Sequence, residues 1–328
     1  MNTANARFRA EREADWLRLD VLLKRVEGQR LRGLSDDDLL ALPLLYRATL
    51  SSLSVARATS LDRALIDYLE ALSLRAYLVI YGASGGFGQR IARFFTHDWP
   101  AAVRTLGRET LVALLILVAG TASGFLLVAS DPNWFEAIVG QDMASGRNPQ
   151  ASADLLRSIL YAKPDNSDGL KVFATWLFTH NAQVALGCFA LGFAFGVPTL
   201  MLLFYNGAAL GAMLQIYAGK GLGVPMAGWL SIHGTTELFA IVIAAAAGLH
   251  SGTRIAFPGA ASRMTAAKQS GRTAAIAMVG VVIMLAVAGL LEGIGRQTIN
   301  DDATRFAIGG SMLGLWLVYF YLLRFCRG

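Results

Sequence analysis

The sequence predicts an all-α membrane protein: a polytopic bundle of about six transmembrane helices preceded by an N-terminal cytoplasmic helical domain. Hydrophobic residues make up 55% of the 328-residue chain and charged residues 16%, whereas soluble domains average about 45–50% and about 25%. The apolar residues gather into stretches long enough to cross a hydrocarbon core, which needs about 20 helical residues. The charged residues gather between these stretches and in the first part of the chain.

The first part of the chain has the pattern of amphipathic helices. Apolar side chains from Trp16 to Val26 recur at helical spacing between charged ones. Ser35 has the position of an N-terminal cap, and three acidic residues follow it where they suit the helix dipole. A second helix is therefore predicted over about 37–59. A third is predicted over 61–81.

A glycine-rich, then basic and aromatic, segment leads to the first membrane span. Residues 82–88 have neither a preceding strand nor the Lys-Ser/Thr pair that ends a phosphate-binding loop, so we interpret them as a flexible joint. Residues 89–108 combine arginines with Phe94, Phe95 and Trp99. This composition predicts a helix at the cytoplasmic membrane interface.

The membrane spans set the domain boundaries and the topology. The chain is predicted to divide into a cytoplasmic region, 1–108, and a membrane domain, 109–328. Arginines and lysines gather before the first span, between the fourth and fifth, and after the sixth. The positive-inside rule then predicts a multi-pass protein of the bacterial inner (plasma) membrane with both termini in the cytoplasm. The predicted spans are 109–129, 172–196, 198–218, 226–249, 274–291 and 306–323.

Three segments are predicted on the opposite side of the membrane, and one of them is a short glycine loop between the third and fourth spans. The loop after the fifth span is expected to contain Glu292. The longer segment, 130–171, includes a run from Trp134 to Val139 with an apolar face, as in an interfacial helix. Two interpretations of this longer segment stay open: it reconnects two spans, or it docks a partner.

Polar side chains inside the predicted spans define the candidate site. An ionisable residue at bilayer depth costs roughly 2.5–3.5 kcal/mol on insertion scales, so its presence needs a structural or functional reason. His180 and Asn181 lie in the second span and Asn206 lies in the third. His233 and Glu237 lie in the fourth, where their i, i+4 spacing places them on one helix face.

Three interpretations of this intramembrane polar cluster stay open. It can be a hydrogen-bond network that joins three spans, a path for protons or ions, or a zinc site formed by His180, His233 and Glu237. The sequence lacks HExxH and a separate carboxylate to act as general base. We therefore expect no catalytic residue, no metal ligand and no cofactor. The chain is predicted not to be an enzyme, with an intramembrane metal-dependent hydrolase as the alternative.

Glycine pairs within or at the ends of the spans have the small-xxx-small spacing that lets helix backbones approach closely. They predict a compact bundle or a homodimer. The four pairs are Gly192/Gly196, Gly207/Gly211, Gly289/Gly293 and Gly310/Gly314.

Three motifs in the middle spans occur in a characteristic order. The His180-Asn181 pair comes first, then Asn206-Gly207 with a small-residue face, then HGxxE from His233 to Glu237 and an alanine-rich run. With these motifs, residues 173–252 resemble the stage II sporulation protein M family of bacterial integral membrane proteins. That family more often carries Asn where His180 stands, which weakens a metal-ligand role for His180.

The resemblance implies a scaffold. The sporulation member of the family looks like a membrane scaffold that holds peptidoglycan-degrading enzymes during engulfment, although nothing in this sequence marks a spore former. We therefore predict a membrane scaffold or assembly protein that organises partner proteins on both membrane faces. The expected partners are the lipid bilayer, such proteins and a second copy of the chain, but no nucleic acid. The alternative is a permease-like transporter component with a polar intramembrane path.

Overall fold

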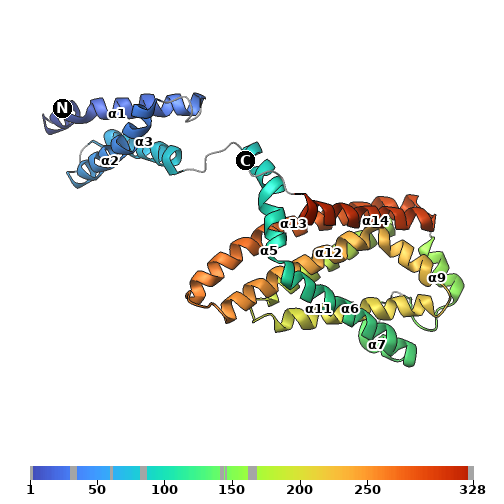
Figure 1. Ribbon diagram of the computed structural model, residues 1–328. Helices are drawn as coiled ribbons and strands as arrows, with labels where there is room; N and C mark the ends of the chain where they lie inside the picture. Colours follow the sequence, from blue (N-terminus) through green and yellow to red (C-terminus); the bar gives the residue numbers. More distant parts are fainter. Residues whose placement is uncertain are drawn as a thin grey trace. The chain divides into compact units, whose positions relative to one another are not determined.

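The computed structural model describes residues 3–29, 35–59, 62–81, 87–140, 144, 146–161 and 168–323. This part of the chain contains helices and turns and no strand, which confirms the predicted all-α class. The chain divides into two compact units, Met1–Arg90 and Ile91–Gly328 (Figure 1). The predicted joint at residues 82–88 lies largely outside the described residues.

The first unit is a bundle of α1 (Thr3–Gln29), α2 (Asp36–Ala58) and α3 (Arg63–Tyr81). Ser35 caps α2 as predicted, because its side-chain oxygen accepts a hydrogen bond from the backbone N–H of Asp38 at 3.3 Å. The apolar stripes of the three helices face one another. Their buried residues include Trp16, Leu19, Leu23, Leu42, Leu45, Leu53, Leu65, Leu69 and Leu72.

The second unit contains the remaining helices. Helix α6 packs against α11, and α12 packs against both α13 and α14 (Figure 1). The elements are α4 (Phe87–Arg93) at the boundary, η2 (Phe94–Asp98), α5 (Trp99–Thr105), α6 (Gly107–Ser130), α7 (Trp134–Val139), α9 (Ala153–Leu160), α10 (Asp168–Leu191), α11 (Val197–Ala218), α12 (Gly223–Ala256), α13 (Arg263–Thr298), α14 (Asp302–Leu317) and η3 (Val318–Leu322).

Among the residues that the structure describes, six helices are long and apolar enough to cross a membrane by length and composition. Five of them, α6, α11, α12, α13 and α14 with η3, coincide with predicted spans. The remaining predicted span, 172–196, coincides with α10, of which only residues 179–191 have described side chains. The chain is thus a multi-span helical membrane protein.

The sixth apolar helix is α2, which the sequence analysis placed in the N-terminal domain. Its first turn carries three acidic residues, and its buried face packs against α1 and α3. Leu42, Leu45 and Leu53 form part of that face. Part of the apolar surface of α2 is therefore buried within the first unit.

α12 is the central helix of the second unit. It contacts α6, α10, α11, α13 and α14, and most of its residues from Met226 to Gly252 are buried. The alanine run 244–247 has no exposed surface. Such small side chains let several neighbouring helices approach one backbone.

Glycines form the closest helix contacts. Gly124 of α6 lies against the backbone of Ala208, and Gly211 of α11 lies against the backbone of Thr121, so a side chain at either position would overlap a carbonyl oxygen. Gly192 lies in the same way against Gly248 of α12. Two of the four predicted glycine pairs therefore serve close packing. Gly293, Gly310 and Gly314 belong to the other two pairs, and a Cβ added at any of them would meet nothing within 4 Å.

The segment after α6 folds back onto the bundle. In α7, Phe135, Ile138 and Val139 are buried in a core shared with α11 and α12, whereas Trp134 is 46% exposed. In α9, Leu156 and Leu160 are buried in the same core. The apolar face predicted for this segment is therefore used mainly inside the unit.

The aromatic segment before α6 is also part of the core. Trp99 is 1% exposed and its ring packs on Phe94, Trp316 and Phe320. The Arg104 guanidinium donates a hydrogen bond to the Phe320 carbonyl at 2.9 Å. These contacts join α5 to the end of α14 and to η3.

Candidate intramembrane polar pocket

All five polar residues predicted from the sequence line one pocket of about 180 Å³. It lies where α10, α11 and α12 meet, because α12 contacts both of the other helices. The i, i+4 pair on α12 faces it from one side, and the other three residues face it from α10 and α11. These residues are His180, Asn181, Asn206, His233 and Glu237.

A hydrogen bond connects two of the helices that line the pocket. The Asn181 side-chain amide donates to Oε1 of Glu237 and so joins α10 to α12. His233, one turn away, is 2% exposed, and the Trp229 ring packs edge-on against its imidazole with 5.5 Å between ring centroids. The Asn206 amide donates to the Leu202 carbonyl of its own helix at 2.8 Å. The Asn181–Glu237 hydrogen bond therefore connects two helices, whereas the Asn206 side chain is hydrogen-bonded within its own helix, α11.

A second buried carboxylate, which is not among the lining residues of the pocket, interacts with Glu237. Glu292 is 2% exposed and interacts electrostatically with Glu237. The assignment of Glu292 to a loop was wrong, because α13 continues to Thr298 and carries Glu292 into the bundle. The apolar stretch of α13 ends before the helix does. Because Gly293 and Gly295 follow that stretch, the sequence does not indicate that the helix continues. Two neighbouring carboxylates in a buried site favour a shared proton or a bound cation.

Arg147 lines the pocket from the segment between α7 and α9. Its Nε donates to the Ala144 carbonyl at 3.1 Å. Burial lowers the pKa of the Arg147 guanidinium from its ordinary value, yet an arginine starts so far above neutrality that it stays charged. No local pattern in the sequence marks this residue, since only the folding back of its segment brings it to the helices.

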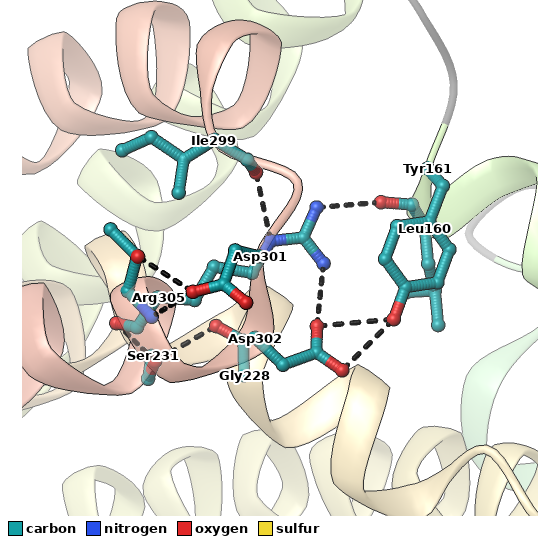
Figure 2. Close-up of polar contacts among 9 residues, drawn as sticks. Leu160, Tyr161, Gly228, Ser231, Ile299, Asp301, Asp302 and Arg305 are labelled. Carbon is teal, nitrogen blue, oxygen red and sulfur yellow. Dashed lines mark hydrogen bonds and ion pairs between the residues drawn. The ribbon is translucent and has the colours of Figure 1, made fainter.

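A separate polar cluster connects the end of α9 to the bundle (Figure 2). Arg305 of α14 is 0% exposed. Its guanidinium donates to the Ile299 carbonyl at 3.0 Å, to the Leu160 carbonyl at 3.0 Å and to Asp302 at 3.3 Å. The Tyr161 hydroxyl donates to the same carboxylate at 2.9 Å. Burial, and then this hydrogen bond, raise the pKa of Tyr161.

The backbone of Arg305 completes this connection. Its carbonyl accepts a hydrogen bond from the Ser231 hydroxyl of α12 at 3.0 Å (Figure 2). Gly309, one turn further along α14, lies directly against the Ser231 backbone. The cluster thus joins three parts of the chain and has a structural role.

The side chains that line the pocket determine which ligands it can recognise. Among the residues that the structure describes, no group of three or more His, Cys, Asp or Glu side chains is arranged to hold a metal ion. His180, His233 and Glu237 share the pocket without forming such a group. The lining offers one carboxylate, two amides, two imidazoles and one guanidinium, which can recognise a polar or charged group.

Two family models match the chain. The model described as stage II sporulation protein M matches residues 113–295, more than half of the chain and all five predicted site residues. The model described as a domain of unknown function (DUF8413) matches residues 6–82, the three helices of the first unit. No curated protein and no solved structure matches the chain. The chain belongs to the stage II sporulation protein M family.

Proposed function

We propose that the chain is a non-enzymatic scaffold or assembly protein of the bacterial inner membrane, with both termini in the cytoplasm and partner proteins on both membrane faces. Family membership and the membrane-spanning helices support a membrane protein. The observation that carries the scaffold role is an apolar surface on the first unit.

The exposed side of α3 is charged in the first half of the helix and apolar in the second half. Its first half exposes charged residues such as Asp67, whose side chain is 58% exposed. Its second half exposes Leu74, Tyr77, Leu78 and Tyr81, at 50–62%. None of these four side chains belongs to the core of the bundle.

The start of α2 extends this apolar surface. Leu40 and Leu44 are 72% and 67% exposed, and the rings of Tyr46 and Tyr81 lie 6.1 Å apart, so the middle of α2 contacts the end of α3. Large exposed apolar patches on helical units mark interaction sites, and tyrosine is enriched at the centres of protein interfaces. We define the apolar end face as Leu40, Leu44, Leu74, Tyr77, Leu78 and Tyr81.

Site-specific photocrosslinking in native membranes tests this role. A photoreactive amino acid at Leu78, in the full chain, is expected to crosslink to a small set of proteins, because this position lies in the apolar end face. The matched control is Asp67 on the charged half of the same helix, which is equally exposed and is expected to give no specific product. Equal products at both positions, or products with lipid alone at Leu78, would contradict the scaffold role.

The polar pocket favours a second candidate, a permease-like transporter component. Glu237 and Glu292 are both buried and interact, and the pocket also contains His180, His233 and Asn206. Such groups at membrane depth are typical of proton and ion paths. The two candidates differ in a direct way, since only the second requires solute or proton flux.

A further inference from the structure

Helices α12 and α13 extend past α6 and α11, and the turn between them lies at one end of the second unit (Figure 1). The first turn of α6 meets α12 at His250, whose Nδ1 lies 2.9 Å from Oε1 of Glu109. The turn before α11 meets α12 at Gly252, which lies against the backbone of Gly196. Residues 253–272, which follow this level, include the last turn of α12, the connecting turn and the first turns of α13. We call them the hairpin end.

The hairpin end is basic. Its sequence contains no aspartate and no glutamate. Arg263, Lys268 and Arg272 are exposed, and none of the three takes part in an ion pair among the residues that the structure describes. Arg254 differs from them, because it interacts electrostatically with Glu109. Three positive charges are therefore available to a partner.

The hairpin end also exposes two large apolar side chains. Phe257 is 82% exposed and Met264 is 79% exposed. These are the highest values for large apolar side chains in the described part of the chain. Isolated exposed apolar residues are common, but large apolar side chains grouped with charges mark interaction sites.

One face of α13 carries both kinds of side chain. Met264, Lys268 and Arg272 follow one another at i, i+4 spacing, which places them along one side of the helix. On the other side, Ala266 and Ser270 are buried, and small residues of this kind let α13 pack closely against α12. The exposed stripe therefore faces away from α12. It is about 12 Å long, which matches two turns of a partner helix.

The bilayer does not account for the exposed apolar side chains. The predicted span of α13 begins at residue 274, and Met264 lies about 15 Å before that point along the helix axis. The head-group region on each side of a hydrocarbon core is only about 5–7 Å thick. Met264 and the turn that contains Phe257 therefore extend past the lipid head groups, where a protein can reach them.

We propose that the hairpin end docks an acidic segment of a partner protein that also carries apolar side chains. Carboxylates of that segment pair with Arg263, Lys268 and Arg272, and its apolar side chains cover Phe257 and Met264. Complementary charge selects such a partner and speeds its association. This surface lies in the second unit and is separate from the apolar end face of the first unit. The inference therefore goes beyond the scaffold proposal and does not depend on it.

Peptide binding to the full chain in lipid nanodiscs tests this proposal. The probe is a short fluorescent helical peptide with glutamates and leucines on one face. In one matched peptide glutamine replaces every glutamate, and in another serine replaces every leucine. The wild-type chain is expected to bind the probe roughly tenfold more tightly than the glutamine peptide, the combined effect of three exposed ion pairs. Because the charges are exposed, binding is expected to weaken as the salt concentration rises.

Two matched triple variants locate the binding surface. Each replaces two exposed arginines and one exposed lysine of the second unit by glutamine, so that both have the same net charge. The test variant combines Arg263→Gln, Lys268→Gln and Arg272→Gln, and the control combines Arg108→Gln, Arg157→Gln and Lys220→Gln. The test variant is expected to bind the probe roughly tenfold more weakly than the wild type, and the control is expected to bind it equally well.

A double variant tests the apolar part of the surface. Phe257→Ser with Met264→Ser is expected to bind the leucine probe no more tightly than the serine peptide, because the leucines have lost their apolar contacts. Its salt dependence is expected to stay that of the wild type, since the three basic side chains remain. All the substituted side chains are exposed, so each variant is expected to melt like the wild type.

Three results would overturn the proposal. The first is equal binding of the acidic and glutamine peptides by the wild-type chain, and the second is equal weakening in the two triple variants. The third is quenching of a fluorescent amino acid at Phe257 by brominated lipids in the nanodisc, which would show that the bilayer covers the hairpin end. The crosslinking result at Leu78 concerns the other unit, so failure of the scaffold proposal and failure of this one can be told apart.

Discussion

Replacing Arg305 by alanine is expected to destabilise the membrane unit by roughly 1–3 kcal/mol, the cost of leaving buried hydrogen-bonding groups without a partner. The guanidinium has no exposed surface and is shared among two carbonyls and Asp302. Its removal leaves the two carbonyls without this donor, whereas Asp302 keeps the hydrogen bond from the Tyr161 hydroxyl. The connection from Leu160 to α14 would be lost, and with it the position of α9.

Thermal unfolding in detergent measures this effect. The control is Arg157→Ala on α9, which removes an exposed arginine and is expected to change stability by less than about 0.5 kcal/mol. Arg305→Lys keeps the charge but not the planar fork of donors, so an intermediate loss is expected. An Arg305→Ala protein that melts like the wild-type chain would show that the cluster in Figure 2 does not hold this part of the fold together.

Replacing Gly211 by alanine is expected to cost about 3 kcal/mol, the upper end of the usual range for overpacking. The added Cβ would overlap the Thr121 carbonyl oxygen, and backbone cannot move aside as a flexible side chain can. The α6 and α11 helices would have to separate along their contact. Since residues of both helices line the polar pocket, the disturbance would reach it.

Gly314→Ala is the matched control, because Gly314 also belongs to a small-xxx-small pair but a Cβ there meets nothing within 4 Å. Alanine is the better helix former by about 1 kcal/mol, so this variant is expected to be neutral or slightly stabilised. The melting temperatures of the two proteins in one detergent compare them directly. Equal effects at both positions would contradict the close α6–α11 contact.

The features that could be predicted from the sequence are those that depend on hydropathy and on the helical spacing of apolar residues. Five spans follow from apolar length, and Trp16 and Leu23 of the first unit follow from their spacing. The polar cluster was predicted because charge and hydrogen-bonding groups are costly in a membrane, which singles out Glu237 within an apolar stretch. Composition alone separates α2 poorly from a span, since packing inside a bundle and burial in lipid require similar residues.

The remaining site residues depend on tertiary structure. Arg147 reaches the pocket only because its segment folds back, and Arg305 is buried only because Leu160 and Ile299 present carbonyls to it. Glu292 lies past the end of an apolar stretch, so hydropathy assigns it to a loop although the helix continues. In each case the missing information is a contact between distant parts of the chain.

Proton flux through proteoliposomes most directly tests whether the polar pocket belongs to a scaffold and not to a transport path. The chains to compare are wild type and Glu237→Gln, which still accepts the hydrogen bond from Asn181 and is expected to melt like the wild type. Glu237→Ala, which leaves the Asn181 amide without its acceptor, is expected to lose roughly 1–3 kcal/mol of stability. The scaffold role predicts no flux above that of empty liposomes for wild type and Glu237→Gln alike. Flux through the wild-type chain that disappears in a folded Glu237→Gln protein would contradict it.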